Sequence, residues 1–146
     1  MAGLVRRMNE NGKYADMNDI TTPQDVQLLV NSFYDRVRQD NIIGHIFQEI
    51  IGNDWSHHLP IMYRFWETVL LDAASYSGNA VQKHIAVDKR MPLQQMHYDR
   101  WLLLWQQTID SLFNGDVAET AKKRATTMMH LIAMKVQWSH EGKTVL

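Results

Sequence analysis

Apolar residues recur at intervals of three or four along most of this chain, which is the spacing of one face of an α-helix. The clearest start signal is Thr22-Pro23-Gln24-Asp25. Here a threonine can cap the helix, a proline fits its first position and an aspartate lies near the positive end of its dipole. We predict a helix from this point to about Asp40-Asn41. Its buried face would consist of Val26, Leu29, Val30, Phe33, Tyr34 and Val37.

The same spacing predicts further helices downstream. After a short turn over 42–50, a helix over about 54–71 would have an irregular first turn, because Pro60 cannot donate a backbone hydrogen bond. A loop over 75–79 would lead to a brief helix over about 81–85, and Met91-Pro92 would open a long helix to about Asn114. Asp116 and Glu119 resemble a capping box for a last helix. No segment alternates apolar and polar residues as a strand does, so the predicted fold class is all-α.

The length of 146 residues suits one domain with one core. Residues 1–20 are polar and aperiodic, and we expect them to form a flexible N-terminal arm. The folded domain would then span 21–138 and be followed by a C-terminal tail over 139–146. We expect a monomer.

Composition and charge argue against several function classes. Lys and Arg number 15 against 16 Asp and Glu, which gives no support to a nucleic-acid partner. The lack of cysteine excludes disulfides, thiolate metal sites and cysteine nucleophiles. No apolar run has the length of a membrane span or follows the early arginines as in a signal peptide, so we expect a cytoplasmic protein without a membrane partner. The common catalytic motifs are also absent. We therefore assign no catalytic residue, and an enzymatic activity would have to rest on a cofactor.

Of the seven histidines, His58 and His84 are the candidates for a functional site. His57 and His58 are adjacent and would point about 100° apart on a helix. Only His58 shares its face with Trp55, Met62 and Phe65, so it is the inward one. His84 lies alone in the apolar segment 80–87. Taken alone, such a residue is more often a hydrogen-bonded core histidine, which is also our interpretation of His97 and His130.

Large aromatic side chains accompany these histidines at helical spacing. A stripe such as Tyr98, Trp101 and Trp105 is more often plain core. However, a buried Tyr34 hydroxyl, Trp101 indole N–H and His58 imidazole must each find a partner or cost about 1–3 kcal/mol. An imidazole on one side, hydrogen-bonding groups on the other and large flat walls are together what a haem pocket requires.

In their order along the chain, these residues resemble a truncated haemoglobin of the third group, over roughly 20–138. Phe33-Tyr34 is similar to the family's distal Phe-Tyr pair, and Phe47 to the phenylalanine that packs against the porphyrin. The segment 55–66 is similar to the distal-helix signature, including its proline. Tyr76-Ser77-Gly78 followed by Lys83-His84 resembles the stretch that leads to the iron ligand, and Trp101 resembles the distal tryptophan. The glycine pairs typical of the first group are not visible, which fits the third.

The resemblance implies a truncated globin fold, a two-over-two helical sandwich around haem b. His84 would be the proximal iron ligand, while Tyr34, His58 and Trp101 would stabilise the distal ligand. Lys83 and Arg90 are candidate partners of the haem propionates because they lie near His84. The residues expected to contact the cofactor are Phe33, Tyr34, Phe47, His58, Met62, Phe65, Trp66, Lys83, His84, Arg90, Trp101 and Leu102.

The implied function is reversible binding of dioxygen or another diatomic ligand at a five-coordinate iron, with oxygen transport as its role. Two alternatives stay open. The same haem suits a redox enzyme, either peroxidase-like or converting nitric oxide with the help of a reductase. A haem-free helical interaction domain is the other, since nine methionines would give an adaptable surface.

Overall fold

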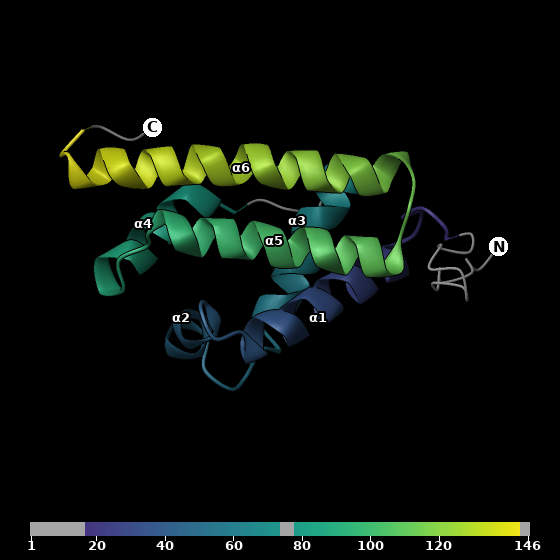
Figure 1. The fold of residues 1–146 in the computed structure, drawn as a ribbon, viewed down its shortest axis with the longest axis horizontal. Helices are drawn as coiled ribbons and strands as arrows, with labels where there is room; N and C mark the ends of the chain where they lie inside the picture. Colours follow the sequence, from purple (N-terminus) through teal and green to yellow (C-terminus); the bar gives the residue numbers. More distant parts are fainter. Residues whose placement is uncertain (1–16, 74–77, 144–146) are drawn as a thin grey trace.

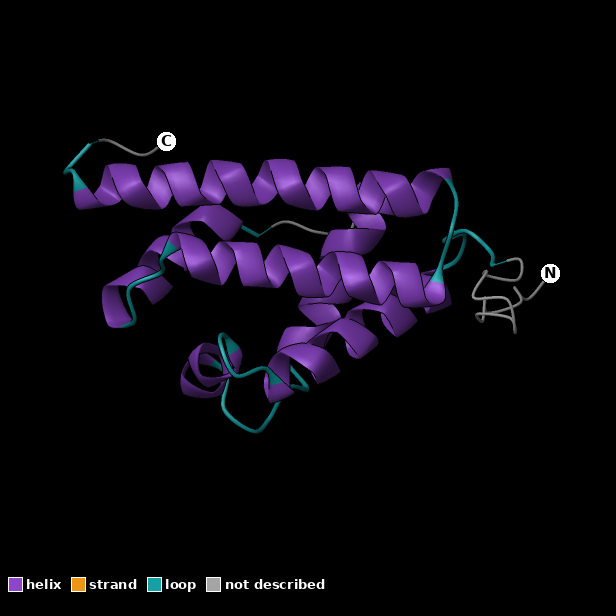
Figure 2. Ribbon diagram, in the orientation of Figure 1, coloured by secondary structure: helices purple, strands orange, loops and turns teal. Residues whose placement is uncertain are grey.

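The computed structural model describes residues 17–73 and 78–143, and every regular element in these ranges is an α-helix (Figure 2). The helices are α1 (Pro23–Gln39), α2 (Gly44–Ile50), α3 (His58–Leu71), α4 (Ala80–Arg90), α5 (Gln95–Leu112) and α6 (Asp116–His140). Helices α5 and α6 run antiparallel along the long axis (Figure 1). Helix α1 packs on α3, and α5 packs on α6. Contacts of α1 with α5 and of α3 with α6 place the first pair over the second. The predicted all-α class is confirmed.

Helix α1 forms as its sequence predicts. The Thr22 hydroxyl accepts a hydrogen bond from the Asp25 N–H at 3.1 Å, and the Asp25 carboxylate accepts one from the Thr22 N–H at 3.1 Å. The helix ends at the predicted place, with Asp40 as its C-cap. All six residues of the predicted face are buried. These signals lie within a few residues of one another, which explains why the sequence is sufficient here.

Several predicted boundaries are wrong for local reasons. The predicted irregular start of the second long helix is present, because 56–57 form a turn and regular helix α3 begins only at His58. Pro60 therefore lies in the first turn, where a backbone N–H has no partner within the helix in any case. Helix α4 extends to Arg90, beyond the predicted end at 85. Met91 is extended, as a residue before proline prefers to be, and the next helix begins only at Gln95. The predicted turn over 42–50 contains the short helix α2.

The start of α6 is capped from far away in the sequence. The predicted capping box at Asp116 is wrong, because Asp116 is already inside the helix. The Asp19 carboxylate accepts hydrogen bonds from the Val117 and Ala118 N–H groups, each at 2.8 Å. Gly115, with φ of +147°, is required beside it, since a Cβ there would lie 2.4 Å from Asp19 Cγ. Residues 1–16 of the predicted arm lie outside the described residues, but its last part packs on the domain.

Two apolar clusters form the core. The larger one joins α1, α3, α5 and the first half of α6, and contains the fully buried Phe33 and Trp105. The smaller one lies under α4 and the second half of α6, and contains Ile85, Tyr98 and Ile132. Trp101 and Leu102 contact both clusters. The gap in packing between these clusters forms the cavity of the candidate site.

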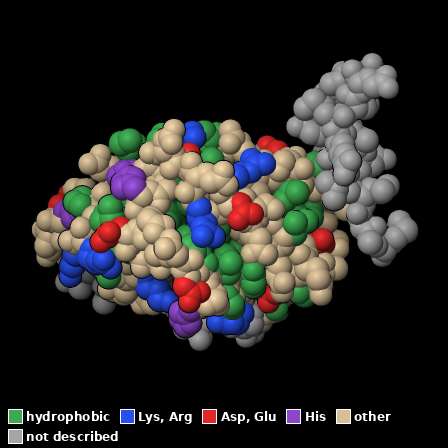
Figure 3. Space-filling model, turned by 90° about the horizontal axis from the view of Figure 1, so that it is seen from below, with side chains coloured by type: hydrophobic (Ala, Val, Ile, Leu, Met, Phe, Trp, Pro, Cys, Tyr) green, Lys and Arg blue, Asp and Glu red, His purple; other side chains and the backbone are tan. Residues whose placement is uncertain are grey.

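The surface carries charges of both signs. On the face drawn in Figure 3, acidic and basic side chains are interspersed, with hydrophobic side chains between them. This matches the net charge of −1. Over 17–73 and 78–143, no helix is both long and apolar enough to cross a bilayer.

Candidate functional site

A cavity of about 430 Å³ lies where the two core clusters meet, a size typical of small-molecule and cofactor sites. All six helices contribute side chains to it. Most of the residues predicted from the sequence line this cavity, namely Tyr34, Phe47, His58, Met62, Phe65, Trp66, Lys83, His84 and Trp101.

Three predicted site residues lie outside the lining. Phe33 is fully buried behind it, with its ring edge-on to Tyr34 at 4.8 Å and to Trp101 at 4.9 Å between centroids. It therefore supports two lining residues. Arg90 is exposed, and its Nη2 pairs with Glu49 Oε1 at 3.2 Å. Leu102 packs into the core clusters.

Other lining residues were not expected at a site. Tyr98, Met128 and Ile132 have the spacing of plain core residues, and His97 has the environment of a structural histidine. The apolar pattern is the same for a residue that packs on protein and for one that faces a cavity. Sequence offers no signal that separates them. The remaining unexpected lining residues are Ile43, Ile46, Ile50, Ile51, Ile61, Ala80, Ala86, Val87, Leu93 and Met129.

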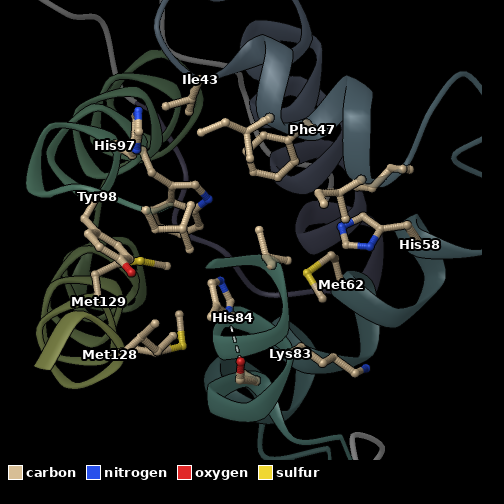
Figure 4. Close-up of a pocket in the computed structure, with 18 of the residues that line it drawn as sticks. Ile43, Phe47, His58, Met62, Lys83, His84, His97, Tyr98, Met128 and Met129 are labelled. Carbon is tan, nitrogen blue, oxygen red and sulfur yellow. Dashed lines mark hydrogen bonds between the residues drawn. The ribbon is translucent and has the colours of Figure 1, made fainter. Parts of the chain in front are cut away.

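His84 projects from α4 to the middle of the cavity (Figure 4). Its Nδ1–H donates to the Ala80 carbonyl oxygen at 2.6 Å, one turn earlier in the same helix. A carbonyl accepts only, so this bond fixes the proton on Nδ1 and leaves the Nε2 lone pair available. Burial lowers the pKa of His84, and the bond to Ala80 opposes that shift only in part. The ring is therefore neutral near pH 7, and a bond to its other nitrogen holds its orientation, as in metal-ligating histidines.

His58 enters the cavity from α3, whereas its neighbour His57 is exposed, as predicted. His58 Nε2 is buried and has no hydrogen-bond partner among the described residues. Burial lowers the pKa of His58 to about 4, and the positive charge of Lys83 contributes to the shift. A neutral buried imidazole without a partner is unfavourable in a finished core, so it points to a ligand.

Tyr34 and Trp101 bring two further polar groups to the same cavity. The Tyr34 ring lies edge-on to that of His58, with 5.5 Å between centroids, and burial raises the pKa of the Tyr34 hydroxyl, which stays neutral. Within the described part of the chain, no hydrogen bond is found for the Tyr34 hydroxyl or the Trp101 indole N–H. The Tyr98 hydroxyl, in the lining of the same cavity, is buried without a partner, as His58 Nε2 is. We call Tyr34, His58 and Trp101 the unpaired set. They offer donors to a polar molecule in the cavity.

The donor set of the cavity suits a cofactor with its own metal better than a bare ion. Over the described ranges, no cluster of three His, Cys, Asp or Glu side chains is placed to hold a metal. His84 offers one neutral imidazole nitrogen inside an apolar cavity with flat aromatic walls. That arrangement can supply one axial ligand to a planar metal complex.

Comparison with known proteins gives a consistent result. No family model matches the chain. A curated protein of Campylobacter jejuni, described as a group 3 truncated hemoglobin, is 28% identical over 105 residues, which cover 70% of this chain and 80% of that protein. The crystal structure of the group III truncated hemoglobin from Campylobacter jejuni matches this fold with a TM-score of 0.71 and 25% identity. This match covers 77% of this chain and 89% of the other. The chain thus has a truncated globin fold, and its predicted resemblance to the group III truncated haemoglobins is confirmed in sequence and in structure.

Proposed function

We propose that this chain is a haem-binding globin that reversibly binds dioxygen or another diatomic ligand. One observation carries the proposal. The cavity combines a single imidazole, whose tautomer is fixed by the Ala80 carbonyl, with an unpaired set of polar groups on its other walls. The Nε2 of His84 and the unpaired set have no partner among the described residues. A haem would provide a partner for the first, and a small polar ligand on the haem would provide one for the second.

The residues of the cavity fit haem. His84 Nε2 would be the proximal ligand, and Phe47, Met62, Phe65 and Trp66 would supply apolar walls. Lys83 lines the cavity with an exposed side chain, which suits a propionate. Arg90 would have to leave Glu49 to do the same. The chain has no cysteine to form a thioether bond, so the proposed cofactor is haem b.

When bound, the haem iron would supply the position at which a diatomic ligand is held. Partial negative charge on dioxygen in that position would be stabilised by hydrogen-bond donors of the cavity wall. The Tyr34 hydroxyl stays protonated, because burial raises its pKa, and it is a donor at any ordinary pH. Trp101 is a donor only, and neutral His58 can donate through one ring nitrogen. The five-coordinate state requires that His58 does not itself take the sixth position.

The test is an ultraviolet–visible spectrum of reduced protein before and after carbon monoxide. We expect a Soret band that shifts on addition of the gas. Protein purified from haem-supplemented cells with no Soret band would contradict the proposal, and a haem-free helical interaction domain would then replace it.

A redox enzyme on the same haem is the second candidate. It is favoured by His58, which is neutral near pH 7 because its pKa is lowered to about 4, and which can therefore accept a proton inside the cavity. Turnover of peroxide, or of nitric oxide with dioxygen and a reductase, would support this candidate. Reversible dioxygen binding without turnover would support the oxygen-binding role, including oxygen transport. For either, we propose a cytoplasmic monomer.

A further inference from the structure

Helix α4, which carries His84, is held on the molecule by few buried side chains. Of its 11 residues, only Ile85 and Asp88 are buried. Among the helices that the structure describes, α6 is the one on which α4 packs extensively. Ile85 and the partly buried Val81 supply apolar contacts to the smaller core cluster. They lie four positions apart on one side of the helix, so they fix rotation about its axis only weakly.

Asp88 supplies the missing constraint. Its side chain is only 5% exposed, and its two oxygens bind two different parts of the chain. Oδ1 accepts a hydrogen bond from the Leu93 N–H at 2.8 Å, in the connection between α4 and α5. Oδ2 accepts from Nε2 of His140, at the end of α6. A buried carboxylate with both oxygens bonded fixes its position strongly, because losing a partner would leave a charge uncompensated.

Asp88 is also placed to control His84. The two residues are four positions apart, so they lie on the same face of α4, one turn from each other. Fixing the Asp88 side chain against α6 therefore fixes the direction in which that face points. Leu93, bonded to Asp88, itself lines the cavity.

We propose that Asp88 and His140 form a latch that holds α4 on α6 and thereby sets the direction in which the His84 ring enters the cavity. The inference rests on the proposed role of His84 as the iron ligand. Both latch members are positioning residues, since neither lines the main cavity.

His140→Leu tests the latch in the full-length protein loaded with haem. The His140 side chain is 44% exposed, so its replacement does not disturb the core. We expect haem to dissociate about tenfold faster, which is typical when a partner that orients a metal ligand is lost. The iron–histidine stretching band of the reduced protein should shift or broaden. Backbone amides of α4 should exchange with solvent about tenfold faster, while those of α5 stay unchanged.

Two matched variants separate the latch from general damage to α6. His140→Gln keeps an N–H donor that can reach Asp88, and it should restore all three readouts. His130→Leu makes the same replacement at an exposed histidine of the same helix, and it should resemble the natural protein. An unchanged stretching band and haem dissociation rate in His140→Leu would overturn the latch, and so would equal effects of His130→Leu.

Hydrogen exchange also separates this inference from the proposed function. If the natural protein takes up no haem, the proposed function fails. Faster exchange in α4 of His140→Leu would then still show that the pair holds the helix, whereas equal exchange would overturn the latch as well.

Discussion

The α4 wall of the cavity and the wall built from α1, α3 and α5 both present polar side chains, but these are bonded in different ways. On α4, the His84 Nδ1–H is bonded to Ala80 at 2.6 Å, so one ring nitrogen is committed and the other is available. On the other wall, His58 Nε2 and the Tyr98 hydroxyl are buried without a partner among the described residues. No hydrogen bond is found there for the Tyr34 hydroxyl or the Trp101 N–H. A group with a fixed orientation is suited to hold a metal, whereas unpaired donors are suited to a ligand that comes and goes.

The supports behind the two walls differ as well. Tyr34 and Trp101 rest on Phe33, which is fully buried in the larger cluster, and Trp101 stacks on Trp105 at 5.5 Å. Behind His84, the described residues provide the small cluster and the polar contacts of Asp88. We therefore expect substitutions on the unpaired wall to change ligand chemistry within an intact site. Substitutions on the α4 wall should affect whether the cofactor stays bound.

The largest effect should come from His84→Ala. Among the described residues that line the cavity, His84 is the histidine whose Nδ1–H is bonded to a carbonyl, which leaves its Nε2 lone pair available. Haem retention should therefore be lost or greatly weakened. The measurement is the haem content of purified protein, with His130→Ala as the control at an exposed histidine. Full haem content with an unchanged ferrous spectrum in His84→Ala would show that the two walls have been assigned the wrong way round.

Tyr34→Phe should have the next largest effect. It keeps the buried ring and removes only the hydroxyl, a donor to a partly charged acceptor that is worth about 1.5–3 kcal/mol. Dioxygen release should therefore become roughly 10- to 100-fold faster, because such differences appear mostly in the off-rate. Carbon monoxide is much less polar, and its release should change far less.

Stopped-flow release rates measure both gases. Equal changes for the two would mean that Tyr34 acts through shape or access, and the hydrogen-bond role would have to be given up. Trp101→Phe should act in the same direction as Tyr34→Phe. The double variant should be non-additive, because both donors serve one ligand.

His58→Leu should be milder and should separate the two histidines. Haem content should stay near normal, because His58 belongs to the unpaired set, while ligand association and release should shift by a few-fold to about tenfold. The haem content and the stopped-flow kinetics of His58→Leu are compared with those of His84→Ala. Loss of haem in His58→Leu, with retention in His84→Ala, would exchange the two roles.

The smallest effect concerns stability in acid. The pKa of His58 is lowered to about 4 in the fold, against 6.5 for an ordinary histidine. Between these values the unfolded chain binds a proton that the folded chain does not, so this residue makes stability fall as the pH falls from about 6.5 to 4. His58→Leu should lose less stability over that interval in urea unfolding at pH 7 and pH 5. His130→Leu, at an exposed histidine, is the control. If the natural protein, His58→Leu and His130→Leu all showed the same pH dependence, the lowered pKa of His58 would be contradicted.

Local sequence determined the parts of this protein whose causes are local. Thr22, Pro23 and Asp25 specify the start of α1, and a spacing of three and four specifies its buried face. The ordered set from Phe33-Tyr34 to Trp101 was enough to predict the truncated globin fold and nine of the residues that line the cavity. Those features need only residues a few positions apart, or their order along the chain.

Tertiary structure decided what depends on partners distant in sequence. Asp19 caps α6 across 98 positions, and Asp88 meets His140 across 52, so no local pattern marks either contact. Tyr98, Met128 and Ile132 follow the same apolar pattern whether they pack on protein or face a cavity. Burial depends on side-chain volume in three dimensions, which helical spacing does not encode. The sequence thus determines which faces are buried, and only the packing of the helices decides where a cavity is left between them.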